Sequence, residues 1–247
     1  MKDLFLNYPE IIIYILIILG AVILIYRIFK RGSLFRADAP GKKTGHSTPL
    51  TVSMERELQG IFGYLNILFA GYWISLALLY LTLVVINILV YYSVFSVYAD
   101  NLIFLSYVLK SISIIPLIFL FTFIAFLATG KKHIARAAAF IFVVIGFFYI
   151  IHLPSATSEN IFNYWIILPS FIGACAMFFM SQLERSKIIK YRVIMSSLAF
   201  MLYPAALYIG GQGAIYGEFS IFSSLVLISV VAGYLGYFPP KAVRQNS

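Results

Sequence analysis

Long runs of apolar residues, separated by short polar segments, repeat along the whole 247-residue chain. A helix needs roughly 20 apolar residues to cross a hydrocarbon core about 30 Å thick. Seven runs meet that length. The pattern therefore predicts an all-α fold, a polytopic membrane helical bundle of seven transmembrane helices. We place these helices near residues 10–28, 65–97, 102–129, 135–153, 161–182, 192–210 and 218–238.

The second run is long enough to be read as two short helices, because no charged residue occurs between Glu57 and Asp100. A hairpin between helices usually contains Gly or Pro, and neither occurs between Gly71 and Asp100. Splitting the run would also place Lys131 and Lys132 outside, against the preference of basic residues for the cytoplasm. One long, tilted helix is therefore predicted.

Basic residues fall almost entirely on one face of such a bundle. Of the 18 Lys and Arg residues, 16 lie in the first, third and fifth loops and in the tail, leaving Lys2 outside and Lys110 within a helix. The rule that positive loops stay inside then puts the N-terminus outside and the C-terminus in the cytoplasm. The chain is expected to be a multi-pass protein of the cell (cytoplasmic) membrane.

Aromatic residues gather near the opposite face and predict an interfacial belt. The first span is not expected to be a cleaved signal peptide, because its positive charges follow the apolar run. The predicted belt consists of Tyr91, Tyr92, Tyr98, Tyr149, Tyr164, Trp165, Tyr208 and Tyr216.

One long polar segment divides the chain into a 1+6 arrangement. We expect an N-terminal anchor at 1–28, a basic cytoplasmic loop at 29–59, a six-helix bundle at 60–240 and a cytoplasmic tail at 241–247. Basic residues beside a membrane attract anionic lipids, at about 1 kcal/mol each. The predicted partners are the lipid bilayer and anionic lipid head groups, the latter at Arg27, Lys30, Arg31, Lys42 and Lys43.

Composition agrees with a bilayer environment, since 62% of residues are hydrophobic, 11% are charged, and mean hydropathy is +0.96. The net charge of +9 does not indicate nucleic-acid binding, because the basic residues lie in short loops rather than on a wetted stripe. The chain has one cysteine, Cys175, and no two histidines at ligand spacing on one helix. We therefore expect no metal site and no cofactor.

Two ionisable side chains are candidates for handling a ligand or an ion. Lys110 lies about 13 Å along its helix from the outer end, and an ionisable residue inside a span is a functional hypothesis by default. The alternative is that its long stem reaches outward to water. His152, at the outer end of the fourth helix, is either a ligand-facing group or a solvated interfacial histidine.

Three prolines are predicted to kink helices, since proline removes one backbone hydrogen bond. They are Pro116, Pro169 and Pro204, in the third, fifth and sixth helices. No serine, cysteine or paired-carboxylate arrangement typical of a hydrolase is evident in the sequence. Whether the protein is an enzyme stays open, with the balance against it.

The last two helices carry a family resemblance. Lys190, Tyr191 and Arg192 open the sixth span, and the run Gly-Tyr-Leu-Gly-Tyr-Phe-Pro-Pro at 233–240 closes the seventh. This resembles the multi-helix membrane sensor regions of some prokaryotic histidine kinases, over about residues 60–240. The sequence contains no dimerisation helix, phospho-acceptor region or ATP-binding domain after Pro240, so kinase activity is not expected to carry over.

The resemblance implies a sensor-like or accessory membrane subunit that acts through a membrane or cytoplasmic protein partner. The alternative is a small-solute transporter or channel, which would suit Lys110 and the three prolines. The scarcity of buried charge and the lack of an internal repeat count against an ion-coupled mechanism.

Overall fold

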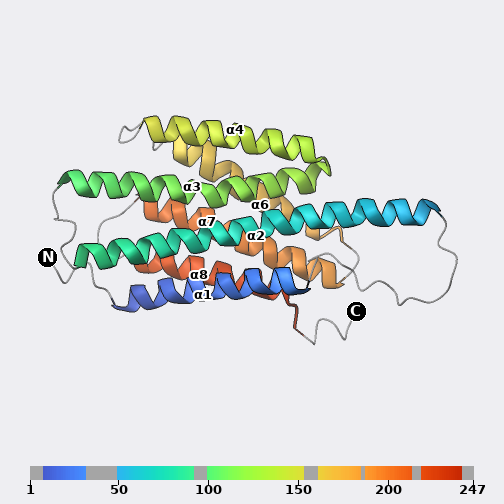
Figure 1. The fold of residues 1–247 in the computed structure, drawn as a ribbon, viewed down its shortest axis with the longest axis horizontal. Helices are drawn as coiled ribbons and strands as arrows, with labels where there is room; N and C mark the ends of the chain where they lie inside the picture. The colour runs from blue at the N-terminus through green and yellow to red at the C-terminus, as the bar shows by residue number, and fades with distance from the viewer. Residues whose placement is uncertain are drawn as a thin grey trace.

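The computed structural model describes residues 8–31, 49–91, 99–152, 161–184, 187–212 and 218–240, and the elements in these ranges are all helices. The helices lie side by side along one direction (Figure 1). In chain order they are α1 (Tyr8–Arg31), α2 (Pro49–Tyr91), α3 (Ala99–Thr129), α4 (Lys132–Ile151), the π-helix η2 (Ile161–Ile167), α6 (Leu168–Ser181), α7 (Lys187–Gln212) and α8 (Glu218–Tyr237).

Their length and composition suit a membrane. Six are long and apolar enough to cross one, with η2 and α6 forming a single span, and α8 adds a shorter apolar segment, Ile221–Tyr237. Large apolar side chains also cover the outside of the bundle, as at Phe140 (69% exposed) and Phe179 (70% exposed). Only lipid can solvate such a surface at low cost. The predicted helical membrane bundle is confirmed.

The long second helix is confirmed as one helix, α2, which runs from Pro49 to Tyr91 without a break. Its start corrects the predicted basic loop, because residues 49–59, which we expected to be loop, are helical. Proline is favoured in the first turn of a helix, where its missing N–H has no partner to lose. The sequence analysis read Pro49 as a loop residue and so began the helix too late.

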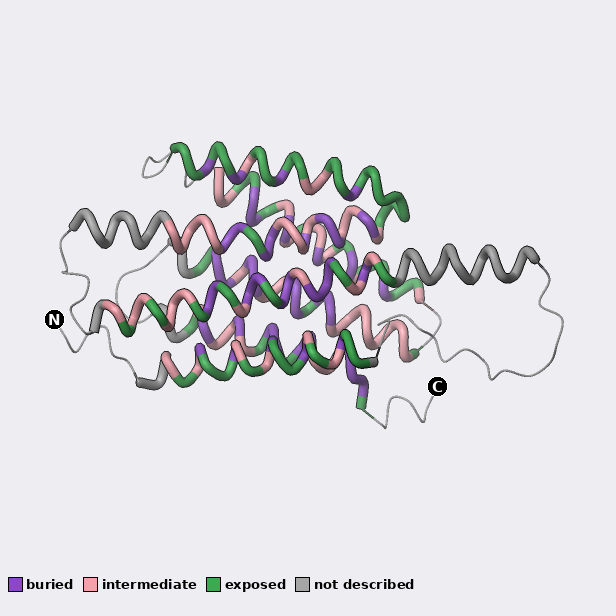
Figure 2. The backbone as a smooth tube through the Cα atoms, viewed as in Figure 1, coloured by how far each residue is buried: buried purple, intermediate pink, exposed green. Residues whose placement is uncertain are grey.

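Helix α8, near the C-terminus, packs against the N-terminal helix α1 and so brings the two ends of the chain together. α8 packs on α7 and α1, α1 packs on α2, and α2 packs on α3. α6 packs on α7 and also touches α3. α4, which packs on α3 and η2, stands at the edge of the bundle and is exposed along most of its length (Figures 1 and 2).

The interior is unusually aromatic. Tyr72 and Trp73 of α2 and Phe200 of α7 are fully buried, and the Tyr72 ring meets the other two edge-on, at centroid distances of 4.9 Å and 5.0 Å. Phe69 adds a further edge-on contact with Phe200 at 5.6 Å. Thus α2, which packs closely on α1 and α3, reaches α7 through large side chains that fill the middle of the bundle.

The three prolines predicted to kink helices differ in their position within the helices. Pro116 lies inside α3 and Pro204 inside α7, as expected. Pro169 is the second residue of α6, directly after the π-helix η2, so it lies within the predicted fifth span at the point where the helix type changes. Without an N–H, Pro169 cannot donate to the carbonyl of Trp165 or Tyr164, so it marks the change from π to α hydrogen bonding.

Candidate functional site

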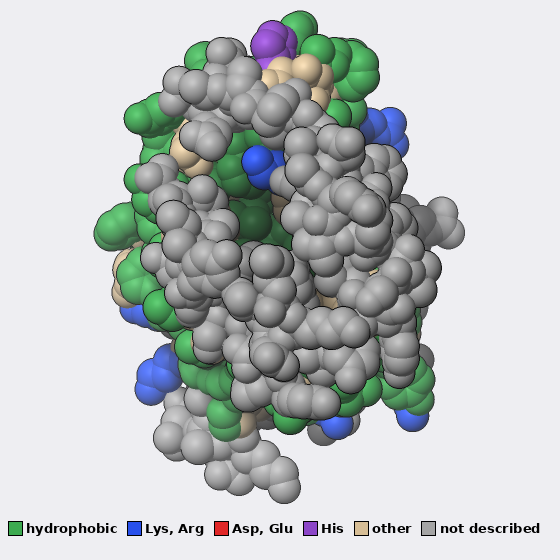
Figure 3. Space-filling view, turned by 90° about the vertical axis from the view of Figure 1, so that its left-hand side faces the viewer, with side chains coloured by type: hydrophobic (Ala, Val, Ile, Leu, Met, Phe, Trp, Pro, Cys, Tyr) green, Lys and Arg blue, Asp and Glu red, His purple; other side chains and the backbone are tan. Residues whose placement is uncertain are grey.

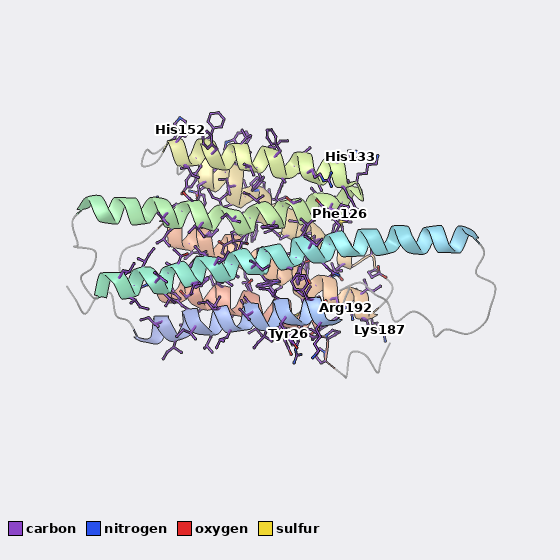
Figure 4. The ribbon with its side chains drawn as sticks, in the orientation of Figure 1. Tyr26, Phe126, His133, His152, Lys187 and Arg192 are labelled. Carbon is purple, nitrogen blue, oxygen red and sulfur yellow. The ribbon has the colours of Figure 1, made fainter. Side chains whose placement is uncertain are left out.

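The described basic side chains other than Lys110 gather at one end of the bundle. Figure 4 shows Tyr26, His133, Lys187 and Arg192 at that end, with His152 at the other. The same end carries the turn between α3 and α4, which contains Lys131. The clustering expected from the sequence is therefore present within the described ranges, and we call this region the basic end. It comprises Arg27, Lys30, Lys131, Lys132, Arg136, Lys187, Lys190 and Arg192.

At the basic end, Arg27 binds other parts of the protein. Its guanidinium lies over the rings of Tyr234 and Phe238 of the α8 segment, 5.3 Å and 4.9 Å from their centroids. It also donates a 2.5 Å hydrogen bond to the Tyr234 hydroxyl. The Tyr237 hydroxyl donates to the Ile28 carbonyl at 3.5 Å. These contacts fasten the end of α1 to the end of α8.

The other predicted lipid contacts are placed only in part. Lys30 is exposed, with its ammonium 5.4 Å from the centre of the Tyr26 ring. Lys42 and Lys43 lie outside the described residues, as does the side chain of Arg31.

His152 ends α4 and is exposed. Its Nδ1 lies 2.8 Å from the carbonyl oxygen of Phe148, one turn earlier in the same helix, and the two rings stack at 6.4 Å. A contact with a carbonyl requires the hydrogen on Nδ1. The geometry is that of a side chain that caps its own helix, which favours an interfacial histidine over a ligand-facing group.

Lys110 is half-buried in α3, about 16 Å along the helix from Ala99. Within the described part of the chain, no ion pair or hydrogen bond of its ammonium is found, while its carbonyl accepts a 2.8 Å bond from the Ser113 hydroxyl. Figure 3 views the end of the bundle opposite the basic end, where a hollow with hydrophobic side chains in its depth has Lys or Arg atoms on its wall.

A second group of polar side chains lies deeper, in the middle of the bundle. We call it the central cluster. Its members come from three helices and are almost completely buried, at most 1% exposed. They are Tyr72, Trp73 and Tyr80 of α2, Tyr203 of α7, and Ser223 and Ser229 of α8.

Two hydrogen bonds tie the central cluster to neighbouring helices. The Tyr203 hydroxyl donates to the Ser113 carbonyl of α3 at 3.0 Å, and the Ser229 hydroxyl donates to the Ala199 carbonyl of α7 at 2.7 Å. Pro116 has no N–H to donate to the carbonyl of residue 112, and Pro204 has none for the carbonyl of residue 200. The two acceptors, Ser113 and Ala199, are the direct neighbours of these carbonyls. Neighbouring helices commonly bond backbone groups at such sites in membranes.

Other polar atoms of the central cluster have no hydrogen-bond partner among the described residues. They are Tyr72 Oη, Trp73 Nε1, Tyr80 Oη and Ser223 Oγ. The Tyr80 hydroxyl interacts with Ser223 and the Tyr72 hydroxyl with Ser229, but without the geometry of a hydrogen bond. A buried polar group without a partner costs about 1–3 kcal/mol. Buried polar groups of native proteins are usually hydrogen-bonded, so these four atoms are candidates for contact with water or a ligand.

Sequence reasoning missed the central cluster, although one signal was available. Tyrosine and tryptophan of membrane proteins favour the interfaces, so Tyr72 and Tyr80, well inside a span, are out of place and need partners. Pattern could not show which side they face. Of the predicted belt residues, Tyr164, Trp165 and Tyr208 are exposed, as an interfacial belt requires. Tyr149 is buried and stacks on Phe162 at 4.9 Å, so its ring does not face the lipid.

The predicted belt residues Tyr91, Tyr92, Tyr98 and Tyr216 have side chains outside the described residues. Within the described ranges, no group of three or more His, Cys, Asp or Glu side chains is arranged to hold a metal ion. The chain matches no protein-family model, no curated protein and no solved structure.

Proposed function

We propose that this integral membrane protein is a sensor-like or accessory subunit that passes a conformational change through α8 to a protein partner. One observation carries the proposal: a single helix holds both Ser223 and Ser229 of the central cluster and the ring of Tyr234 that clasps Arg27. Any molecule that shifts α8 at the cluster would also move the contact between α8 and α1. The resemblance of residues 190–192 and 233–240 to kinase sensor regions supports the same role.

The basic end is the side on which a cytoplasmic partner would bind. Positive residues favour the cytoplasm, and the described basic side chains at this end include the exposed Arg136 and Lys187. Such an arrangement suits the cell membrane, with anionic lipids beside Lys30 and an acidic protein surface against the loops. It also puts the hollow of Figure 3 on the outer side.

The alternative function is transport of a small solute. Lys110 supports it, because its half-buried ammonium has no described partner and lies toward the end with the hollow. The packing of the interior favours the sensor role. Phe69, Tyr72, Trp73 and Phe200 meet ring against ring at the centre of the described bundle, where these large side chains lie between α2 and α7.

A crosslinking experiment in the native membrane tests the proposal. A photoreactive residue placed at Arg136 or Lys187 should capture one protein reproducibly in near-stoichiometric yield after mild-detergent purification. In the variant that carries the photoreactive residue at Arg136, replacing Lys187 and Lys190 by Glu should abolish the capture, because the partner's acidic surface would then be repelled.

The matched control places the same photoreactive residue at Phe147 of α4, which is exposed among apolar side chains and should crosslink to lipid. The subunit role would be contradicted if no protein were captured from any crosslinking position, or if the same protein were captured in equal yield after the charge reversal. In that case solute-flux assays with Lys110→Met become the next test, because the transporter would be the better account.

A further inference from the structure

The strongest unexplained feature of the bundle is the pair of hydroxyls of Tyr80 and Ser223. Both side chains are 0% exposed, and they come from α2 and α8. They lie close enough to interact, yet neither oxygen has a hydrogen-bond partner in the described part of the chain. A polar contact that lies outside direct hydrogen-bonding geometry can be completed by a bridging oxygen from water or a ligand.

The surroundings decide what kind of molecule could supply that oxygen. The Tyr80 ring is flanked by Tyr14 of α1, at a centroid distance of 5.4 Å, and by Phe222 of α8, stacked at 6.3 Å. Aromatic walls in a low-dielectric interior disfavour an ion, because desolvation of a charge is costly there. Hydroxyl groups can donate to an acceptor oxygen and also accept from a donor. The walls and hydroxyls together fit an uncharged group.

We propose that Tyr80 and Ser223 hold a small uncharged molecule whose oxygen bridges their hydroxyls. The source of this oxygen is either ordered water or a lipid-soluble carbonyl or hydroxyl compound. The bridge links α2 to α8 across the bundle, although the two helices do not pack closely together. About two turns earlier on α2, Tyr72 Oη and Trp73 Nε1 also have no hydrogen-bond partner among the described residues. The assignment does not depend on the sensor role.

Thermal unfolding of the full chain in nanodiscs tests the proposal, because a bridging molecule and a dry gap predict changes in Tm of opposite sign. If the bridge exists, Tyr80→Phe and Ser223→Ala each remove one of its anchors, and each should lower Tm by about 2–4 °C. The double variant should fall no further than either single variant, because both changes release the same molecule. Tyr164→Phe is the matched control, since Tyr164 is 64% exposed and its Tm should not change.

A dry gap gives the opposite sign. Removing a hydroxyl that has no partner from an apolar interior leaves Tm unchanged or raises it, and that result would overturn the proposal. Effects of Tyr80→Phe and Ser223→Ala that simply add would overturn it too, because the hydroxyls would then act separately.

Mass spectrometry of a solvent extract separates the two sources. A compound present in equimolar amount with the wild-type chain and lost from Tyr80→Phe identifies a lipid-soluble ligand. If no such compound is found but Tm falls as predicted, a high-resolution map decides: an ordered oxygen bonded to both side chains identifies water, and a direct hydrogen bond between Tyr80 and Ser223 with no third oxygen would overturn the proposal.

Discussion

Trp73 of α2 occupies the space in which any side chain at Gly233 of α8 would lie. A Cβ atom at Gly233 would come within 2.3 Å of Cζ2 of the Trp73 indole, well inside contact distance. Trp73 is itself fully buried. The central cluster therefore depends on a glycine three positions before Gly236, where α7 and α8 also approach closely.

We expect Gly233→Ala to destabilise the bundle by about 1–3 kcal/mol, the usual cost of overpacking. A second change, Trp73→Leu, should recover part of this loss, because it removes the atoms with which the new methyl group collides. Thermal unfolding in nanodiscs measures both. Gly63→Ala is the control, since a Cβ there meets nothing within 4 Å. Because alanine forms helices better than glycine, Gly63→Ala should leave Tm unchanged or raise it. A loss at position 63 equal to that at position 233 would contradict the contact with Trp73 as the cause.

Tyr203→Phe removes the hydrogen bond that α7 donates to the Ser113 carbonyl of α3. Interhelical hydrogen bonds in membranes are worth about 0.6 kcal/mol on average, and loss of the donor here should lower Tm by a few degrees. Tyr208→Phe, five residues along the same helix and 49% exposed, should have no effect. An unchanged Tm for Tyr203→Phe would mean that the Ser113 carbonyl finds another donor.

Arg27→Lys keeps the positive charge but loses the planar group that lies over Tyr234 and Phe238. Since lysine does not replace a stacked guanidinium, we expect a loss of about 1 kcal/mol. Lys30→Met, at an exposed position, should change Tm little. The loss at Arg27 should be the same in neutral and in anionic nanodiscs. A loss seen only with anionic lipid would instead make Arg27 a head-group ligand, as the sequence alone suggested.

Lys110→Met separates the two accounts of Lys110. If the lysine is structural and its ammonium reaches outward, the variant should be silent or slightly more stable, because a desolvated charge is expensive. If Lys110 handles a ligand or an ion, the variant should keep its Tm and expression but lose solute flux or response.

The sequence predicted the helices well because one force dominates their formation. An apolar run such as 102–129 must be helical in lipid, whatever its neighbours, since every backbone group needs an internal partner. The absence of Gly and Pro after Gly71 likewise sufficed to predict α2 as one helix. The start of α2 was not predicted, because proline occurs both in loops and in the first turn of a helix, as at Pro49.

The interior could not be predicted in the same way. Tyr72 and Tyr164 both lie within apolar runs, yet one is 1% and the other 64% exposed. The difference depends on how the helices are rotated about their axes, and α2, α7 and α8 have weak amphipathic patterns because lipid and protein interior are equally apolar. The π-helix before Pro169 also leaves no hydrophobic pattern by which to find it.

The central claim is a membrane bundle whose basic end faces the cytoplasm, and labelling of single cysteines from one side tests it most directly. In a Cys175→Ser background, His152→Cys and Lys187→Cys report the two ends, both at exposed positions. Applied to intact cells, a membrane-impermeant maleimide should label His152→Cys at once and Lys187→Cys only after permeabilisation. Labelling of both from outside, or of Lys187→Cys alone, would contradict the account.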